Sequence, residues 1–215
     1  FDIAGSCESA DSTSGDFFDF IGHGVGTWDI VLADVCGHGI GPAMVTVGAR
    51  RLLRSCSELH QDLGRLLTFA NRGICEDTVQ SLFVTLFFAR IDPATKQIAY
   101  VGAGHPAFLI GSDGSIKELS GRGIPAGIDP SHRYESDGSI VIPPDSIVLI
   151  MTDGLLEAHK DDQVPFGRER AFELVYQNRE KSAGEIAATL LAEVKSFCRP
   201  QKLSDDVTAV VIKSL

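Results

Sequence analysis

The sequence predicts an α+β fold, a four-layer α-β-β-α sandwich in which two central antiparallel sheets are flanked by helix pairs. Apolar, β-rich runs are separated by short turns rich in Gly, Pro and Asp, which favours antiparallel strands. Two stretches change to helical periodicity, and each contains two consecutive helices that must cover a sheet face. With 215 residues, of which 44% are hydrophobic, the chain is long enough to bury such a core. We therefore expect one domain over residues 1–215.

The first half of the chain begins with a hairpin and continues into a helix pair. The apolar residues Met44, Val47, Leu52 and Leu53 recur with the spacing of one helix face. We expect strands over 15–21 and 28–35, joined by a turn-forming segment at 22–26, and helices over 41–57 and 63–74.

The second half contains many strands, another helix pair and a final strand. Ser182 and Glu185 have the spacing of a capping box, so we expect a helix to begin there. The expected strands are 82–91, 97–102, 107–110, 116–119, 139–142, 147–152 and 207–212, and the expected helices are about 168–179 and 182–198.

The charge of the chain is acidic and unevenly distributed. Nineteen Lys and Arg residues against 29 Asp and Glu residues give a net charge of −10, which excludes an electrostatic footprint for nucleic acid or an anionic membrane. Residues 1–49 contain seven acidic residues and no Lys or Arg. Either this is a solvated acidic face or a cation binds there. We expect Asp19 and Asp29 to be solvated strand residues.

Cysteine content and hydropathy indicate where such a chain would work. Five cysteines without a C-x-x-C pair predict neither a disulfide framework nor a zinc site, which favours reduced thiols in the cytoplasm. The apolar runs are far shorter than a membrane span. Because the sequence begins at Phe1 without a methionine, we expect a domain excised from a longer multidomain protein.

Two carboxylates of the first hairpin are predicted to face each other. Residue 25 is midway between Asp16 and Asp34 and falls within the turn, so a near-symmetric hairpin places their Cβ atoms about 5 Å apart. Like charges directly across a ladder destabilise it unless a carboxyl is protonated or a cation lies between them. The hairpin is therefore a candidate cation site.

Acidic residues also end or begin other apolar strands. Asp34 follows the run 30–33, Asp153 follows the run 147–151, and Asp205 precedes the run 209–212. Carboxylates at such positions are costly to desolvate unless they are paired or coordinated. No cluster of Lys or Arg adjoins them in sequence, which favours an all-oxygen site for Mg²⁺ or Mn²⁺. We expect the neighbouring Asp206 to organise its turn.

Six short motifs carry a family resemblance across nearly the whole chain. They are GDFFD at 15–19, DVCGHG at 34–39 running into PA at 42–43, YVGAGHP at 100–106, GIPAG at 123–127, TDGLLEA at 152–158 and DDVT at 205–208. In this order they resemble the SpoIIE/RsbU-type bacterial phosphatases, which belong to the metal-dependent PPM (type 2C-like) serine/threonine protein phosphatases. The fold that this resemblance implies agrees with the fold expected from the strand and helix pattern.

The resemblance also implies a binuclear Mn²⁺ or Mg²⁺ centre, with two ions per domain. The implied ligands are Asp34 as the bridge between the metals, the Val35 carbonyl, Asp16 for the second metal, Asp153 and Asp205 for the first, and Glu157 for a weaker third ion. A water activated by the two metals would attack phosphorus in line. His38 or a metal-bound water would protonate the leaving oxygen.

The expected function is hydrolysis of phosphoserine or phosphothreonine on a regulatory phosphoprotein. From the resemblance, the substrate is a partner-switching, anti-anti-sigma-like protein, and a sensor or receiver domain upstream in the same protein regulates activity. A homodimer is left open. The alternative is a catalytically silent regulatory binding module, a pseudophosphatase that keeps the fold without turnover.

Overall fold

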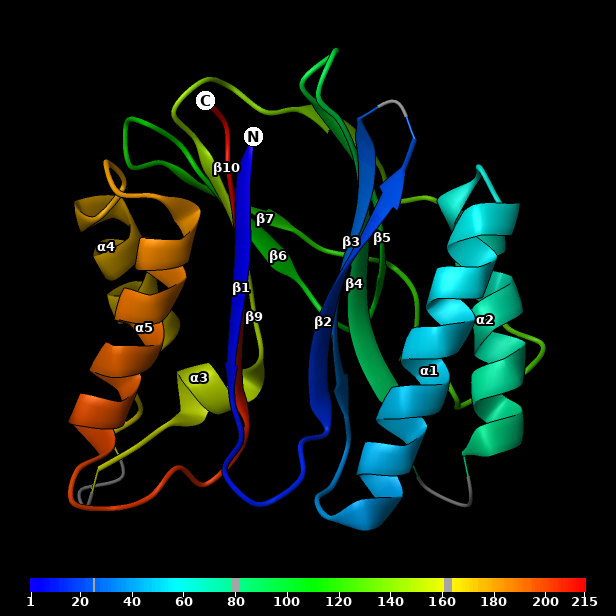
Figure 1. The fold of residues 1–215 in the computed structure, drawn as a ribbon, viewed down its shortest axis with the longest axis horizontal. Helices are drawn as coiled ribbons and strands as arrows, with labels where there is room; N and C mark the ends of the chain where they lie inside the picture. Colours follow the sequence, from blue (N-terminus) through cyan, green and yellow to red (C-terminus); the bar gives the residue numbers. More distant parts are fainter. Residues whose placement is uncertain (25, 79–81, 161–163) are drawn as a thin grey trace. The chain divides into compact units, whose positions relative to one another are not determined.

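The computed structural model describes residues 1–24, 26–78, 82–160 and 164–215, and the chain divides into two compact units. Unit 1 comprises residues 1–12, 107–119 and 143–215, and unit 2 comprises residues 13–106 and 120–142. Each unit contains one five-stranded antiparallel sheet and its own helices (Figure 1). The expected α+β class with two antiparallel sheets is confirmed.

Unit 1 is a sheet with the order β1-β10-β9-β6-β7 and three helices. Its elements are β1 (Asp2–Glu8), β6 (Ala107–Ile110), β7 (Ile116–Leu119), β9 (Ile147–Met151), α3 (Asp153–Glu157), α4 (Arg168–Gln177), α5 (Ala183–Cys198) and β10 (Val207–Lys213). Its core combines inward residues of β9 and β10 with the apolar face of α5, for example Leu149, Val211 and Leu190. The predicted capping box starts α5, where the Ser182 side chain accepts a hydrogen bond from the Glu185 backbone N–H.

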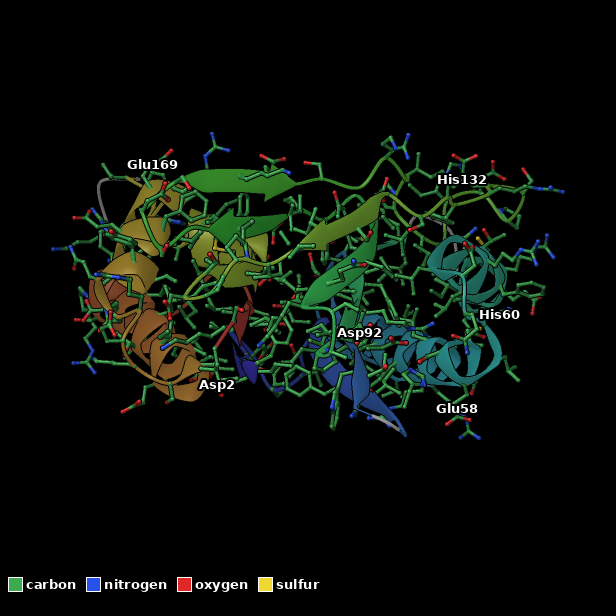
Figure 2. The ribbon with its side chains drawn as sticks, turned by 90° about the horizontal axis from the view of Figure 1, so that it is seen from above. Asp2, Glu58, His60, Asp92, His132 and Glu169 are labelled. Atoms are coloured by element: carbon green, nitrogen blue, oxygen red, sulfur yellow. The ribbon has the colours of Figure 1, made fainter. Side chains whose placement is uncertain are left out.

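Unit 2 is a sheet with the order β2-β3-β4-β5-β8, with α1 and α2 side by side on one face (Figure 1). Its elements are β2 (Asp16–His23), β3 (Thr27–Val35), α1 (Ile40–Leu59), α2 (Leu63–Asp77), β4 (Val84–Asp92), β5 (Gln97–Ala103) and β8 (Gly138–Val141). The helix-facing residues of β3 and β4, such as Val31 and Phe88, pack with Leu53 and Leu67. Figure 2 shows His132 on the segment between β7 and β8, which is bound to α2 where Asn71 donates to the Asp129 carbonyl.

Two elements were not anticipated from the sequence. β1 lies at the edge of its sheet, and its residues are mostly half-buried, so apolar and polar positions do not alternate clearly. α3 has five residues, too few for a helical period to be visible. Among the described residues, no helix is both long and apolar enough to cross a bilayer.

The expectation that Asp19 and Asp29 are solvated is wrong. Asp19 is 5% exposed and accepts hydrogen bonds from the guanidinium groups of Arg50 and Arg54, which extend from α1. Both aspartates occupy odd-numbered positions of the hairpin, on the face that packs against the helices. Part of the acidity of residues 1–49 is thus neutralised by arginines distant in sequence.

Asp29 is fully buried in a polar network beneath α1. Its carboxylate accepts hydrogen bonds from Nε of Arg90 at 2.6 Å and from Nη2 of Arg90 at 2.7 Å. The Ser57 hydroxyl donates a third hydrogen bond to it at 2.6 Å. Nε2 of His23 lies 2.9 Å from both the Asp29 carboxylate and the Ser57 hydroxyl. In the Ser-His-Asp triad of a hydrolase, the serine and the aspartate contact opposite nitrogens of the histidine ring. Here the Ser57 hydroxyl and the Asp29 carboxylate both contact Nε2 of His23. This network is therefore structural.

Replacing Arg90 with methionine should destabilise the fold strongly. Loss of the guanidinium leaves the Asp29 carboxylate buried without its main countercharge, which typically costs about 3–5 kcal/mol. Urea denaturation of Arg90→Met measures this loss. Arg168→Met is the matched control, because its ion pair with Glu169 is exposed and should contribute less than about 1 kcal/mol. Equal stability of the two variants would contradict the assignment.

Asp19 should make the stability depend on acid pH. Burial opposes its ionisation, but the hydrogen bonds from Arg54 and Arg50 outweigh this effect and hold the pKa of the carboxyl below its ordinary value. Its contribution is therefore complete above the ordinary Asp pKa of about 3.9 and is lost as the pH falls through the lower pKa of the folded state. The difference in unfolding free energy between wild type and Asp19→Asn should shrink in that window. A difference that stays constant with pH would refute this.

Candidate metal centre

Asp16 and Asp34 face each other directly across the first hairpin, as the sequence predicts. Asp16 begins β2, Asp34 is the penultimate residue of β3, and the two are partners in the β2–β3 register. The Val25 position between them lies outside the described residues. Asp16 is 6% exposed and Asp34 is half-buried, so both carboxylates occupy a partly desolvated environment. Two carboxylates in this geometry fit a hard cation.

The Val35 carbonyl lies close beside this pair because residue 15 is glycine. The Val35 N–H donates to the Gly15 carbonyl at 3.2 Å, and a Cβ on Gly15 would lie 2.8 Å from the Val35 oxygen. No side chain fits at position 15 without displacing that carbonyl. Unit 2 thus combines two carboxylates and a nearby backbone oxygen, the donor types that Mg²⁺ and Mn²⁺ prefer.

His38 is exposed in the segment between β3 and α1. It is flanked by Gly37 and Gly39, whose φ angles of 91° and 92° disfavour other residues. The segment turns the chain from the end of β3 into α1, four residues beyond Asp34. The side chain is therefore accessible to a substrate at this end of the sheet.

Asp153 and Asp205 are brought together within unit 1 by a close backbone contact at Gly154. The Thr152 N–H donates to the Thr208 carbonyl and the Thr208 N–H to the Thr152 hydroxyl, both at 3.0 Å, which joins the ends of β9 and β10. A Cβ on Gly154 would lie 2.1 Å from the Asp206 carbonyl oxygen and 3.2 Å from the Asp205 Cβ. Only glycine allows the two acidic segments to meet so closely.

Glu157 and Asp206 occupy different positions relative to this pair. Glu157 ends α3 four residues after Asp153, so both exposed carboxylates belong to one face of that short helix. Asp206 is 9% exposed, and its carboxylate accepts the Ala10 N–H at 2.8 Å. This contact joins Asp206 to a residue 196 positions away along the chain, so the expectation that Asp206 organises its own turn stays a prediction. Among the described residues of either unit, no three His, Cys, Asp or Glu side chains form a group that could hold a metal.

Thr85 and His105 extend the acidic pair across the sheet of unit 2. Thr85 of β4 is the register partner of Asp34, and its hydroxyl oxygen lies 3.2 Å from Nδ1 of His105. His105 is 7% exposed. The YVGAGHP motif contains this histidine, but the sequence gives no sign that Thr85 lies next to it. The YVGAGHP motif thus marks His105 in the sequence, whereas no motif marks Thr85.

The chain is similar in sequence to one family model and to curated bacterial proteins. The sequence model of the family described as Stage II sporulation protein E (SpoIIE) matches residues 24–214. Protein IcfG of Synechocystis sp. is 28% identical over 95% of this chain and 36% of its own length. Phosphoserine phosphatase RsbU of Bacillus subtilis is 26% identical over 99% of this chain and 63% of its own length.

The fold is shared with a domain of solved structure. The SiaA-PP2C domain of Pseudomonas aeruginosa superposes with a TM-score of 0.85 at 19% identity, covering 98% of this chain and 84% of that one. The chain spans between about one third and two thirds of the curated relatives named above. The expected fold therefore has a solved counterpart, whereas the full-length relatives extend well beyond it.

Removing one charge of the opposed pair should stabilise the metal-free protein. Asp34→Asn ends the repulsion between two carboxylates in register, which is worth up to about 1 kcal/mol. Urea denaturation in a chelating buffer measures the gain. Glu193→Gln, on the exposed side of α5, is the control for a general loss of negative charge and should change stability by less than about 0.5 kcal/mol. A less stable Asp34→Asn variant under these conditions would contradict the repulsion.

Proposed function

Because the chain belongs to the SpoIIE family, we propose that it is a metal-dependent protein phosphatase that hydrolyses phosphoserine or phosphothreonine. The observation that carries the proposal is the pair Asp16 and Asp34, held in register at the end of a hairpin beside the Val35 carbonyl. The name of the RsbU relative, phosphoserine phosphatase, supports the same reaction class. The products are a free hydroxyl side chain and inorganic phosphate.

Each unit supplies part of the proposed ligand set. In unit 2 these are the carboxylates of Asp16 and Asp34 and the Val35 carbonyl. In unit 1 they are Asp153 and Asp205, with Glu157 available for a weaker third ion. When bound, two Mn²⁺ or Mg²⁺ ions supply an activated water for in-line attack on phosphorus and offset charge on the phosphoryl oxygens.

The remaining chemical task falls to the chain's own residues. The leaving serine or threonine oxygen needs a proton, and we assign His38 as the donor because its side chain is exposed just beyond the Asp34 strand end. The competing donor is a water molecule held by the carboxylate set. A smaller kcat for His38→Ala on a phosphopeptide, but an unchanged kcat on p-nitrophenyl phosphate, would support His38, because nitrophenolate leaves without protonation.

The proposed substrate is a regulatory phosphoprotein of the partner-switching type. The family assignment and the RsbU relative support this class. We further propose that a sensor or receiver domain in the same protein controls the activity, since the matched relatives are longer than this chain. Among the described residues, none of the five cysteines forms a disulfide, which suits a cytoplasmic setting.

Turnover should require both a divalent cation and the acidic residues of both units. Wild type should hydrolyse p-nitrophenyl phosphate and a phosphoserine peptide with added Mn²⁺ and lose activity with a chelator. Asp34→Ala and Asp153→Ala should each lower kcat/KM by more than about 100-fold, beyond the 10–100-fold effect typical of outer-shell metal partners. Glu193→Gln should retain full activity.

Two results would contradict this assignment. If well-folded wild type shows no metal-dependent turnover on either substrate, the chain is a binding module with the phosphatase fold. If turnover persists in Asp34→Ala, the reaction does not depend on the hairpin carboxylates.

A further inference from the structure

Three neighbouring strands of unit 2 carry a continuous row of polar side chains. Asp16 of β2 is the register partner of Asp34 of β3, and Asp34 is also the partner of Thr85 of β4. Directly paired side chains lie on the same face, with Cβ atoms about 5 Å apart. Thr85 is therefore the in-register neighbour of a carboxylate that belongs to the proposed ligand set.

His105 continues this row beyond the strands. Its Nδ1 lies 3.2 Å from the Thr85 hydroxyl oxygen, and the residue is 7% exposed. A side chain so buried has little rotational freedom, so the contact with His105 restrains the side chain of Thr85. Where Nδ1–H donates to the Thr85 oxygen, the hydroxyl proton of Thr85 points elsewhere, and the Asp34 carboxylate is its in-register neighbour.

The position of His105 is determined by the close approach of two glycine motifs. The Gly104 N–H donates to the Gly123 carbonyl at 3.1 Å, and the Gly123 N–H donates to the Gly102 carbonyl at 3.2 Å. A Cβ on Gly121 would lie 2.2 Å from the Gly102 Cα, and Gly104 has a φ of 76°. Side chains at these positions would force the segments apart and move His105.

The same GIPAG motif also holds the strand that carries Thr85. The Ala126 N–H donates to the Val84 carbonyl, and the Val84 N–H donates to the Ala126 carbonyl, both at 2.8 Å. Residues 123–126 therefore bind the turn before His105 and the residue before Thr85 at once. This accounts for two of the sequence motifs that no metal ligand explains.

We propose that Thr85 and His105 are positioning residues for Asp34, and that His105 Nδ1–H orients the Thr85 hydroxyl to donate to the Asp34 carboxylate. This inference rests on the proposed function, because it assigns the pair to the metal-binding state of Asp34. A hydrogen bond to the carboxylate fixes its rotamer, which lowers the entropy lost when the metal binds. Residues behind a ligand in this way typically account for 10–100-fold in metal affinity.

The experiment measures Mn²⁺ affinity by isothermal titration calorimetry and by electron paramagnetic resonance of free Mn²⁺. Thr85→Val removes the hydroxyl at constant shape and should weaken binding about 10–100-fold, whereas Thr85→Ser should restore it. Thr27→Val is the matched control, a half-buried strand threonine near the far end of the same sheet, and should bind like wild type. At saturating Mn²⁺, Thr85→Val should recover most of the wild-type kcat.

Variants of His105 test whether this residue orients the Thr85 hydroxyl. His105→Asn keeps a donor near the Nδ1 position and should retain most of the Mn²⁺ affinity, whereas His105→Leu should resemble Thr85→Val. If His105→Leu does not fold, the comparison of Thr85→Val with Thr85→Ser still decides the proposal. Melting temperatures in chelating buffer separate a loss of metal affinity from a loss of stability.

The outcomes separate this inference from the proposed function. Wild type that binds no Mn²⁺ would overturn both. Mn²⁺ binding that is lost in Asp34→Asn, but unchanged in Thr85→Val, would preserve the proposed function and overturn the positioning role. A Thr85→Val variant that is unstable without metal yet binds Mn²⁺ normally would show that the contact with His105 serves packing alone.

Discussion

The arrangement of unit 2 depends on two carboxylates that a β-ladder holds directly opposite each other. A short hairpin fixes the register of the two strands. This register places Asp16 directly opposite Asp34 even though like charges repel each other. Hydrophobic burial on the other face of the strands, at Phe17, Val31 and Ala33, supplies the free energy that keeps the ladder in place. The apolar packing of this unit therefore keeps two like charges in register.

Glycines at close backbone contacts recur wherever acidic or polar residues are assembled. Gly15 admits the Val35 carbonyl, Gly154 admits the Asp205–Asp206 segment, and Gly121 admits the Gly102 turn. In each case a hydrogen atom replaces a Cβ that would lie within 3 Å of backbone. The acidic and polar side chains named above are therefore positioned by contacts between main-chain atoms. Main-chain atoms adjust less readily than side chains do, so the positions of these side chains are narrowly determined.

Much of this arrangement could be predicted from the sequence, for physical reasons that also mark its limits. Strand alternation, helical period and the capping box at Ser182 are local signals, and the opposition of Asp16 and Asp34 follows from hairpin symmetry alone. The arginine partners of Asp19 and Asp29 lie between 31 and 61 residues away along the chain, so no local pattern reveals them. No local pattern marks Thr85 for the same reason, since sheet topology makes it the neighbour of Asp34.

The pairing of β1 with β10 has a consequence for the order in which the protein assembles on the ribosome. Unit 2 is complete once Ile142 has been synthesised, whereas β1 waits for a partner strand that begins at Val207. Such long-range pairing is slow to form, and an unpaired edge strand is exposed in the meantime. Asp205 directly precedes β10, so its position beside Asp153 is set only once this strand has been synthesised and has paired with β9. A chain interrupted before Val207 would thus contain the folded hairpin with Asp16 and Asp34 but no strand β10 for β1 to pair with.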